Sequence, residues 1–203
     1  MNNFQIEMPL DYTPHLKTFV FPGGTLPQRH SKLAAGYDIH ARLIVHQKLK
    51  ESNDPDTRLL LFDFENEPSE EQKQHLNGII ERDLQTGEYV YYIPPMSMCF
   101  VAIGFAMEMP FPLFYFIVSK SGLSIIKLVG INHSPSTIDA DFRGEPGALI
   151  YNEGLEPFAL RQNDRIAQII FLYAVMPIFD QVESIEELSI TTRGTNGLGS
   201  TGT

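Results

Sequence analysis

Short apolar runs separated by turn residues are the feature that most constrains the fold of this chain. Each run is rich in Tyr, Phe, Ile and Val, and Gly, Pro, Asn or Asp stand between the runs. Residues of these types fit a pleated, half-buried strand better than a helix. The pattern predicts an all-β barrel or jelly roll, with strands in the segments 89–95, 99–108, 113–118, 147–152, 158–162 and 165–173.

The longest apolar stretch, residues 99–118, resembles a membrane span only at first sight. It contains Gly104, Glu108 and the turn sequence Pro110-Phe111-Pro112, whereas a lipid-facing helix needs about 20 uninterrupted apolar residues. Two strands, 99–108 and 113–118, explain the same letters better. We therefore predict a hairpin around the proline turn and no membrane partner.

One segment has the periodicity of a helix. Residues 69–86 begin with a Ser-x-x-Gln capping box after Pro68 and end before Gly87. The apolar side chains between these limits follow helical spacing, at Leu76, Ile79, Ile80 and Leu84. We expect one amphipathic helix, inside an insertion at about 47–88, that covers a sheet edge or a subunit contact.

Composition limits the class of protein. A chain of 203 residues that is 43% apolar is long enough for one domain, expected over 1–192, that buries roughly 70% of its unfolded surface. The net charge of −10 with only 15 Lys and Arg argues against a nucleic-acid partner. The single cysteine, Cys99, lies in an apolar run, and the first residues have no basic and apolar signal pattern. We expect a reducing compartment, the cytoplasm.

The last eleven residues, 193–203, have a composition that suits a phosphate ligand. Four glycines free the backbone to present its N–H groups, Ser and Thr add hydroxyl donors, and Arg193 adds a planar cation. Such a nest with one guanidinium fits a polyphosphate. The same letters are also typical of a disordered linker.

Four further motifs precede this tail: AAGYDI at 34–39, SKSGLS at 119–124, STIDADFRGE at 136–145 and NDRIAQ at 163–168. With the tail, they resemble the five motifs of the homotrimeric dUTPase family, within the superfamily that also contains dCTP deaminases. The resemblance implies a jelly-roll-like distorted barrel of the β-clip type. It also implies hydrolysis of dUTP to dUMP and pyrophosphate with Mg²⁺, in a homotrimer whose sites lie between subunits and are closed by the 193–203 arm of a neighbour.

The resemblance assigns the catalytic residues. Asp139 would deprotonate the water that attacks the α-phosphorus, a role open to an ionised carboxylate. Asp139 and Asp141 alternate on an apparent strand and should face the same side, and Asp141 is expected to pair with Arg143. Asp38 would hold water around a magnesium ion that is bound mainly by substrate phosphates. Zinc is not expected, because the six histidines have no zinc-site spacing.

Substrate binding is divided among the motifs by the same resemblance. Phosphate oxygens would be bound by Lys120, Ser121, Gly122 and Gln168, and by the tail residues Arg193, Gly197, Gly199, Ser200 and Thr201. Lys120 stands where the family has Arg, so the charge is kept and the two-pronged fork is lost.

The nucleoside motif departs from the family pattern. The hairpin before Asp139 would read the base through His133, Thr137 and Ile138. His133 replaces the usual Asn, and Ser136 replaces a glycine whose φ angle could be positive. Phe142 replaces the Tyr under the deoxyribose, and Leu198 replaces the Phe that stacks on uracil.

Two alternatives remain at this point. An enzyme of the deaminase branch, which acts on deoxycytidine nucleotides, is suggested by the insertion and opposed by Leu149, which stands where that branch has its catalytic Glu. A non-catalytic nucleotide-binding regulator is suggested by the departures in the motifs and opposed by the retained Asp139.

Overall fold

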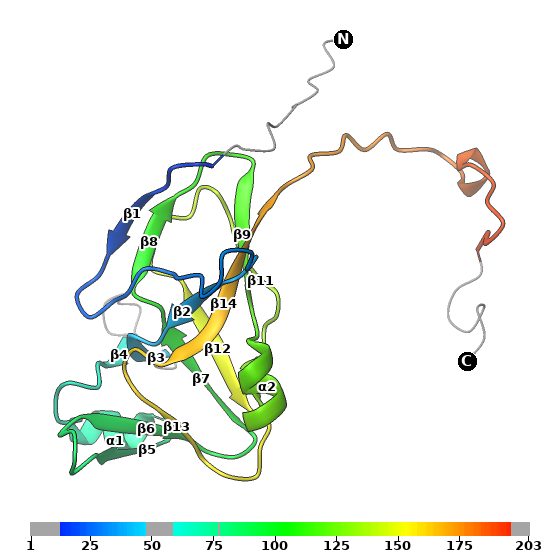
Figure 1. The fold of residues 1–203 in the computed structure, drawn as a ribbon. Helices are drawn as coiled ribbons and strands as arrows, with labels where there is room; N and C mark the ends of the chain where they lie inside the picture. The colour runs from blue at the N-terminus through cyan, green and yellow to red at the C-terminus, as the bar shows by residue number, and fades with distance from the viewer. Residues whose placement is uncertain (1–12, 48–58, 77, 196–203) are drawn as a thin grey trace.

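The computed structural model describes residues 13–47, 59–76 and 78–195, and these residues form four antiparallel sheets (Figure 1). A four-stranded sheet has the order β11-β9-β14-β2, with β11 at Ser136–Ile138, β9 at Leu113–Val118, β14 at Arg165–Tyr173 and β2 at Tyr37–His40. A five-stranded sheet has the order β10-β12-β7-β3-β4, with β10 at Val129–Ile131, β12 at Gly147–Asn152, β7 at Ser97–Ala102, β3 at Leu43–Gln47 and β4 at Leu59–Phe62.

Two smaller sheets complete the body. β13 (Phe158–Leu160), β6 (Tyr89–Ile93) and β5 (Ile79–Arg82) form one of them, and β1 (Lys17–Val20) pairs with β8 (Phe105–Glu108) in the other. The predicted all-β fold class is confirmed, as are strands in each of the apolar runs. The run 165–173 is a strand over its whole length.

The core lies between the two large sheets, because their strands alternate buried and partly exposed side chains. In β9 the side chains of Leu113, Tyr115 and Ile117 are buried, and in β12 those of Ala148 and Ile150 are buried. Tyr115, Ile117, Ala148 and Ile150 join one apolar cluster with residues of β2, β3, β7 and β14. Each large side chain removed from water contributes roughly 2 kcal/mol to folding, so this alternation fixes which faces of the sheets are turned inward.

A buried amide ties the end of β12 to the end of β6. Asn152 is 1% exposed, and its Nδ2 donates to the carbonyls of Ile93 at 3.0 Å, Pro94 at 3.2 Å and Glu156 at 2.9 Å. Its Oδ1 accepts from the N–H of Gly154 at 2.9 Å. One side chain therefore satisfies four backbone groups that would otherwise lose hydrogen bonds on burial.

The predicted hairpin around Pro110 and Pro112 is wrong. The run 99–108 is broken at Gly104, which has φ +81°, and is divided between β7 and β8. β8 pairs with β1, whereas β9 pairs with β11 and β14. The proline turn therefore connects two different sheets.

The predicted helix over 69–86 is also wrong in its extent. Helix α1 covers Glu70–His75, and the expected capping box of Ser69 and Gln72 is present. The chain then leaves the helical conformation at Leu76, and β5 pairs with β6 along Ile79–Arg82. Gly78 allows this pairing, because a Cβ there would lie 2.5 Å from the ring of Tyr91. The described part of the insertion thus contains β4 and β5 as well as the short α1, and its residues 48–58 lie outside the described residues.

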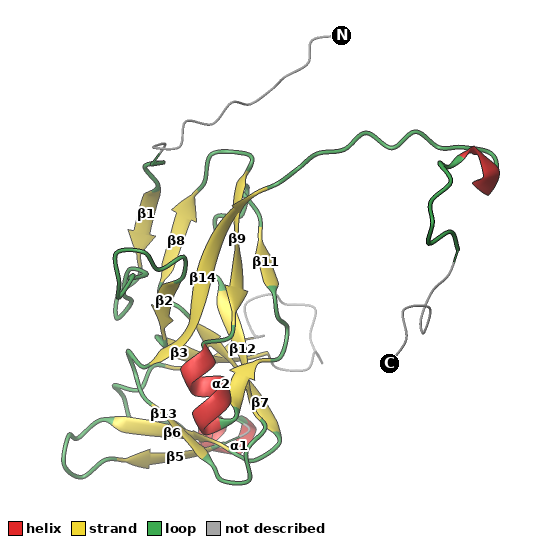
Figure 2. Cartoon of the chain, turned by 45° about the vertical axis from the view of Figure 1, so that its right-hand side comes forward, coloured by secondary structure: helices red, strands yellow, loops and turns green. Residues whose placement is uncertain are grey.

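The chain leaves the barrel after Tyr173 and extends away from it (Figure 1). Figure 2 shows this segment as loop, apart from one 3₁₀ turn at Ile185–Glu187. Its apolar side chains are exposed, with Ile178 at 90% and Phe179 at 89%. The expected start of the arm at Arg193 falls inside this segment. Within the part of the chain that the structure describes, no helix has the length and apolar character needed to cross a membrane.

Candidate active site

The register of the four-stranded sheet brings three of the motifs side by side. Asp38 on β2 pairs with Gln168 on β14, and Gln168 pairs with Val118 at the end of β9. Ser119 and Lys120 follow directly, before helix α2 (Ser121–Lys127) begins. Residues separated by more than 80 positions in the chain therefore meet at one end of one sheet.

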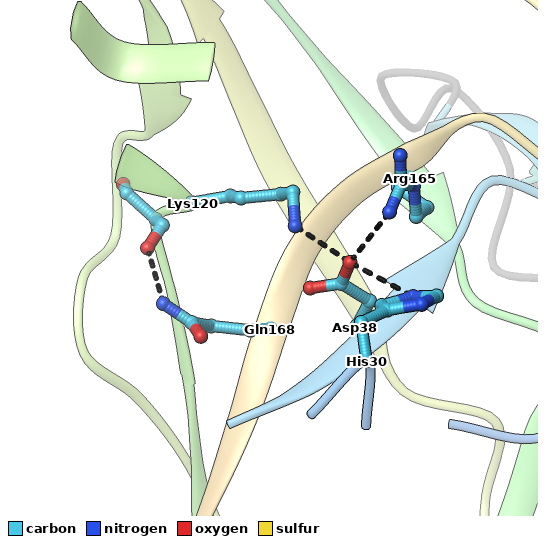
Figure 3. A network of polar contacts seen from close by, with 6 residues as sticks. His30, Asp38, Lys120, Arg165 and Gln168 are labelled. Atoms are coloured by element: carbon cyan, nitrogen blue, oxygen red, sulfur yellow. Dashed lines mark hydrogen bonds and ion pairs between the residues drawn. The ribbon is translucent and has the colours of Figure 1, made fainter. Parts of the chain in front are cut away.

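Asp38 is the centre of a cluster of basic side chains (Figure 3). Its Oδ2 lies 2.6 Å from Nζ of Lys120, 3.4 Å from Nη1 of Arg165 and 3.2 Å from Nε2 of His30. Asp38 is only 5% exposed, while the three basic side chains reach solvent. Lys120 and Arg165 outnumber the one carboxylate, so the surface of the cluster is positive and suits an anion.

His40 lies next to this cluster, opposite Arg165 in the sheet. Burial lowers the pKa of His40 and outweighs the negative charge of Asp38, which raises it; the positive charges of Arg165, His30 and Lys120 add smaller effects that lower it. Among the buried side-chain nitrogen and oxygen atoms of the described ranges, only Nδ1 of His40 has no hydrogen-bond partner. The protonated ring is therefore disfavoured in the folded protein.

Gln168 is oriented by its neighbours. Its Nε2 donates to the carbonyl of Ser119 at 3.1 Å (Figure 3). On the other side, a Cβ at Gly36 would lie 2.1 Å from Oε1 of Gln168. Gly36 of the AAGYDI motif is thus required, because any side chain there would clash with the amide of Gln168 in the NDRIAQ motif.

Ser121 and Gly122 form the first turn of α2. Lys120 is the N-cap residue and makes no side-chain capping hydrogen bond. Ser121 and Gly122 are exposed, and a Cβ on Gly122 would meet no atom within 4 Å. The first backbone N–H groups of a helix are donors without helical partners, so these two residues present donors beside Lys120.

Asp139 lies at the opposite end of the same sheet. Ile138, the last residue of β11, pairs with Tyr115, so Asp139 is displaced from Lys120 by six strand positions, or about 20 Å at the usual rise per residue. Lys120, Gln168 and Asp38 are therefore brought together within one chain, and Asp139 is not brought to them.

The prediction that Asp139 and Asp141 alternate on a strand is wrong, because β11 ends at Ile138 and a turn follows. Both residues nevertheless line one pocket of about 580 Å³. Arg143 donates through Nη1 to the carbonyls of Ala140 at 2.6 Å and Phe142 at 3.0 Å. No ion pair between Asp141 and Arg143 occurs among the described residues, since this guanidinium is used to close the turn.

A second pocket, of about 390 Å³, contains the predicted nucleoside residues. It is lined by β11, by the turn before it, by the loop that follows Asp139 and by β12, including His133, Ser136, Thr137, Ile138, Phe142, Glu145 and Leu149. Ser136 lies in a strand, outside the set of residues with positive φ. Its hydroxyl donates to the carbonyl of His133. The replacement of glycine by serine is therefore compatible with the backbone at this position.

Three side chains at these sites were not identified by the sequence analysis. Arg165 is part of NDRIAQ, but its approach to Asp38 follows from strand pairing over 127 positions. His30 reaches Asp38 because a bridge pairs Gln28 with Asp38. Glu145 ends the STIDADFRGE motif, and its partner Arg42 is 103 positions away. Of the tail residues, Arg193 is exposed at the end of the extended segment, and Gly197, Leu198, Gly199, Ser200 and Thr201 lie outside the described residues.

Comparison with known proteins identifies the family. The family model described as dUTPase matches residues 82–202, more than half of the chain. The deoxyuridine 5′-triphosphate nucleotidohydrolase of Zymomonas mobilis is 36% identical over 125 residues, which are 62% of this chain and 83% of that protein. The protein of the same name from Fowlpox virus is 36% identical over 114 residues, 56% of this chain and 77% of that protein. The chain belongs to the dUTPase family.

Solved dUTPase structures have the same fold. The dUTPase of Staphylococcus bacteriophage 80alpha with dUpNHpp aligns with a TM-score of 0.60 at 19% identity, covering 94% of this chain and 100% of that chain. The dUTPase of phage phi11 of S. aureus, described with a species-specific insert, aligns with a TM-score of 0.56 at 16% identity over 86% of this chain and 100% of that chain. A variant of the phi11 protein has been described with a structural Mg(II) ion, and it aligns with a TM-score of 0.56 at 17% identity over 85% of this chain and 99% of that chain. These alignments support the dUTPase-like fold expected from the motifs.

Proposed function

We propose that this dUTPase-family chain hydrolyses dUTP to dUMP and pyrophosphate. The observation that carries the proposal is the register that places Asp38, Gln168 and the Lys120–Ser121 segment at one end of a sheet. That end presents cations, an amide and helix N–H groups. Donors of these kinds are suited to the oxygens of a triphosphate.

In the proposed reaction, Asp139 accepts a proton from water as the water oxygen bonds to the α-phosphorus. The bond between the α-phosphorus and the oxygen that bridges it to the β-phosphorus breaks, and pyrophosphate leaves with that oxygen. Asp139 is exposed at the rim of a pocket, where water can reach it. A carboxylate in this position is suited to general-base catalysis, which commonly contributes two to four orders of magnitude, that is about 10²–10⁴-fold in rate.

The active sites are proposed to lie between the copies of a homotrimer. About 20 Å of strand separates Asp139 from Lys120 in one chain, which is too far for both to touch one triphosphate. A second copy supplies Asp38, Ser121 and Gln168 to the Asp139 of the first. The arm after Tyr173, which leaves its own barrel (Figure 1), reaches a third copy and brings the glycine-rich tail to the phosphates.

Nucleoside selection is proposed to occur in the pocket beside β11. The ring of Phe142 would lie under the deoxyribose and leave no room for a 2′-hydroxyl. Phe142 is 42% exposed, so its ring is available to a ligand. Leu149 lines this pocket and supplies no proton donor, which argues against deamination of a cytosine base.

We infer that Mg²⁺ accompanies the triphosphate. Within the described ranges, no group of three or more His, Cys, Asp or Glu side chains is placed to hold a metal ion. Asp38 already faces three basic side chains, so it suits a contact through water better than direct ligation. Mg²⁺ commonly keeps several waters and binds substrate phosphates. When bound, it would neutralise charge on the phosphate oxygens.

We also propose a reducing location such as the cytoplasm. Cys99 is a buried free thiol, and burial raises its pKa. A buried protonated thiol is unreactive and serves as a small apolar side chain.

The test is incubation of the purified protein with dUTP, dCTP and UTP, each with Mg²⁺. We expect dUMP and pyrophosphate from dUTP and no ammonia from any nucleotide. Some turnover of dCTP is expected, because each contact altered by His133 or Leu198 is worth about 1 kcal/mol, or several-fold in rate. Release of ammonia from dCTP would favour the deaminase branch. Binding without turnover of any deoxynucleotide would favour a regulator.

A further inference from the structure

An ion pair behind the nucleoside pocket connects the end of the STIDADFRGE motif to the barrel. Nε of Arg42 donates to Oε1 of Glu145 at 2.7 Å, and Nη2 of Arg42 donates to Oε2 of Glu145. The two side chains are only 18% and 14% exposed. A planar fork on a carboxylate fixes both distance and orientation, and most of this pair is shielded from water.

Glu145 has a third donor, which holds it against the backbone of the barrel. The N–H of Gly104 donates to Oε1 of Glu145 at 2.7 Å. Gly104 lies between β7 and β8, and its carbonyl accepts from the N–H of Phe21 at 3.0 Å. Arg42 precedes β3, its guanidinium lies 5.4 Å from the ring centre of Phe21, and its N–H donates to the carbonyl of Ala102 at 2.9 Å. The carboxylate is thus fixed from two directions by residues of the packed body.

From Glu145 the contacts lead to Phe142. Gly144, the neighbour of Glu145, lies so close to the aromatic ring that a Cβ on it would stand 2.7 Å from Cζ of Phe142. The N–H of Phe142 donates to the carbonyl of Asp139 at 3.2 Å. Phe142 and Glu145 line the same pocket. The loop from Asp139 to Glu145 is therefore attached to β11 at one end and to Arg42 at the other.

We infer that Arg42 and Glu145 are positioning residues that hold the Phe142 ring for selection of deoxyribose, an inference that rests on the proposed dUTP hydrolysis. Neither side chain is assigned to catalysis. If the anchor is removed, the loop must become ordered when the nucleotide binds, and the ring no longer excludes a 2′-hydroxyl as strictly. Binding and sugar selection should suffer more than the chemical step, because Asp139 directly follows β11.

The experiment compares steady-state kinetics with dUTP and UTP for Arg42→Ala, Arg42→Lys and Glu145→Gln. For Arg42→Ala we expect KM for dUTP to rise about tenfold, which corresponds to ordering about one residue on binding. We expect kcat to stay within about threefold of wild type, and the preference for dUTP over UTP in kcat/KM to fall about tenfold. Arg42→Lys keeps the positive charge but loses the two-pronged contact of the guanidinium, so we expect KM for dUTP to rise about threefold. Glu145→Gln keeps an oxygen that can accept from the N–H of Gly104, so we expect a similar rise of about threefold in KM for dUTP.

The matched control is Lys17→Ala, which removes the exposed 3.3 Å pair between Lys17 and Glu108 and should leave KM, kcat and the UTP preference unchanged. A merely structural role of the Arg42 pair would lower the melting temperature and the amount of folded enzyme, and it would leave KM and the ratio of the two nucleotides unchanged. A folded Arg42→Ala variant with wild-type KM and ratio would overturn the inference. If that variant does not fold, wild-type values in folded Arg42→Lys and Glu145→Gln would overturn it. Wild-type protein that releases no pyrophosphate from dUTP would overturn the proposed function, and the inference with it.

Discussion

The replacement Gly36→Ala should damage the candidate active site without unfolding the protein. The added Cβ would lie 2.1 Å from Oε1 and 2.9 Å from Cδ of Gln168, but 3.5 Å from Cβ of the same residue. The last of these distances is an ordinary contact. Rotation of the Gln168 amide would therefore remove the steric clash, but it would break the 3.1 Å hydrogen bond from this amide to the carbonyl of Ser119.

The expected magnitudes follow from these contacts. A neutral hydrogen bond contributes about 1 kcal/mol to stability, and Gly→Ala at a compatible backbone position returns about 0.4–1 kcal/mol. The free energy of unfolding should thus change by less than about 1 kcal/mol. A hydrogen bond to a charged group is worth about 1.5–3 kcal/mol, so loss of the amide from the phosphates should lower kcat/KM for dUTP by about 10–100-fold.

The assay is a double-mutant cycle of Gly36→Ala and Gln168→Ala, with kcat/KM and urea unfolding measured for all four proteins. Because both changes remove the same amide from the site, the double variant should be about as active as Gln168→Ala alone. Ala35→Ser, which adds one heavy atom at the exposed neighbouring position, is the control and should retain wild-type activity. Additive losses in the cycle, or wild-type activity of Gly36→Ala, would refute the steric argument.

Four other perturbations have defined outcomes. Asp139→Asn should fold and bind nucleotide but lose about two orders of magnitude or more in turnover, and pyrophosphate release at the wild-type rate would remove Asp139 from the mechanism. Asn152→Ala removes four hydrogen bonds from a side chain that is 1% exposed and should lower the free energy of unfolding by about 3–5 kcal/mol, whereas a loss below about 1 kcal/mol in urea unfolding would contradict the role of this amide. The lowered pKa of His40 means that the unfolded chain binds the proton more tightly, so the stability contribution is complete above the unfolded pKa of about 6.5 and is lost as pH falls from there through the folded pKa. His40→Phe should remove this part of the pH dependence in thermal unfolding, and an unchanged slope would contradict it. A chain that ends at Thr192 should still form the proposed trimer by light scattering and lose most activity, and full activity without the tail would show that the arm is dispensable.

The strands were predictable where the pattern is local. The run 165–173 has β-branched and aromatic residues between turn residues, and it is a single strand. The helix over 69–86 was overextended because Leu76, Ile79 and Ile80 satisfy helical spacing, while the close approach of Gly78 to Tyr91 depends on a partner strand. The hairpin at the proline turn failed for the same reason, since the partner of β8 is β1.

The candidate site was likewise predictable only in part. The motif letters indicated Asp38, Gln168 and Lys120 as members of one site, and the sheet register places them together. The letters did not indicate that Asp38 faces Lys120, Arg165 and His30 at once, because that arrangement depends on pairing between distant strands. The pairing of Arg42 with Glu145 is invisible for the same reason, as is the distance between Asp139 and Lys120.

The central claim is that one active site uses Asp139 of one copy and the phosphate-binding residues of another. Its most direct measurement is complementation between two inactive proteins, Asp139→Asn and the double variant Ser121→Ala with Gln168→Ala, co-expressed with different tags and purified through both. Purification through both tags leaves only trimers of mixed composition, and in a cyclic trimer of this kind about one site in three pairs an intact Asp139 with an intact phosphate-binding segment. We therefore predict that the purified mixed oligomers recover up to about a third of wild-type dUTP hydrolysis, with the purified parents inactive. Mixed oligomers that remain as inactive as both parents would contradict the shared site.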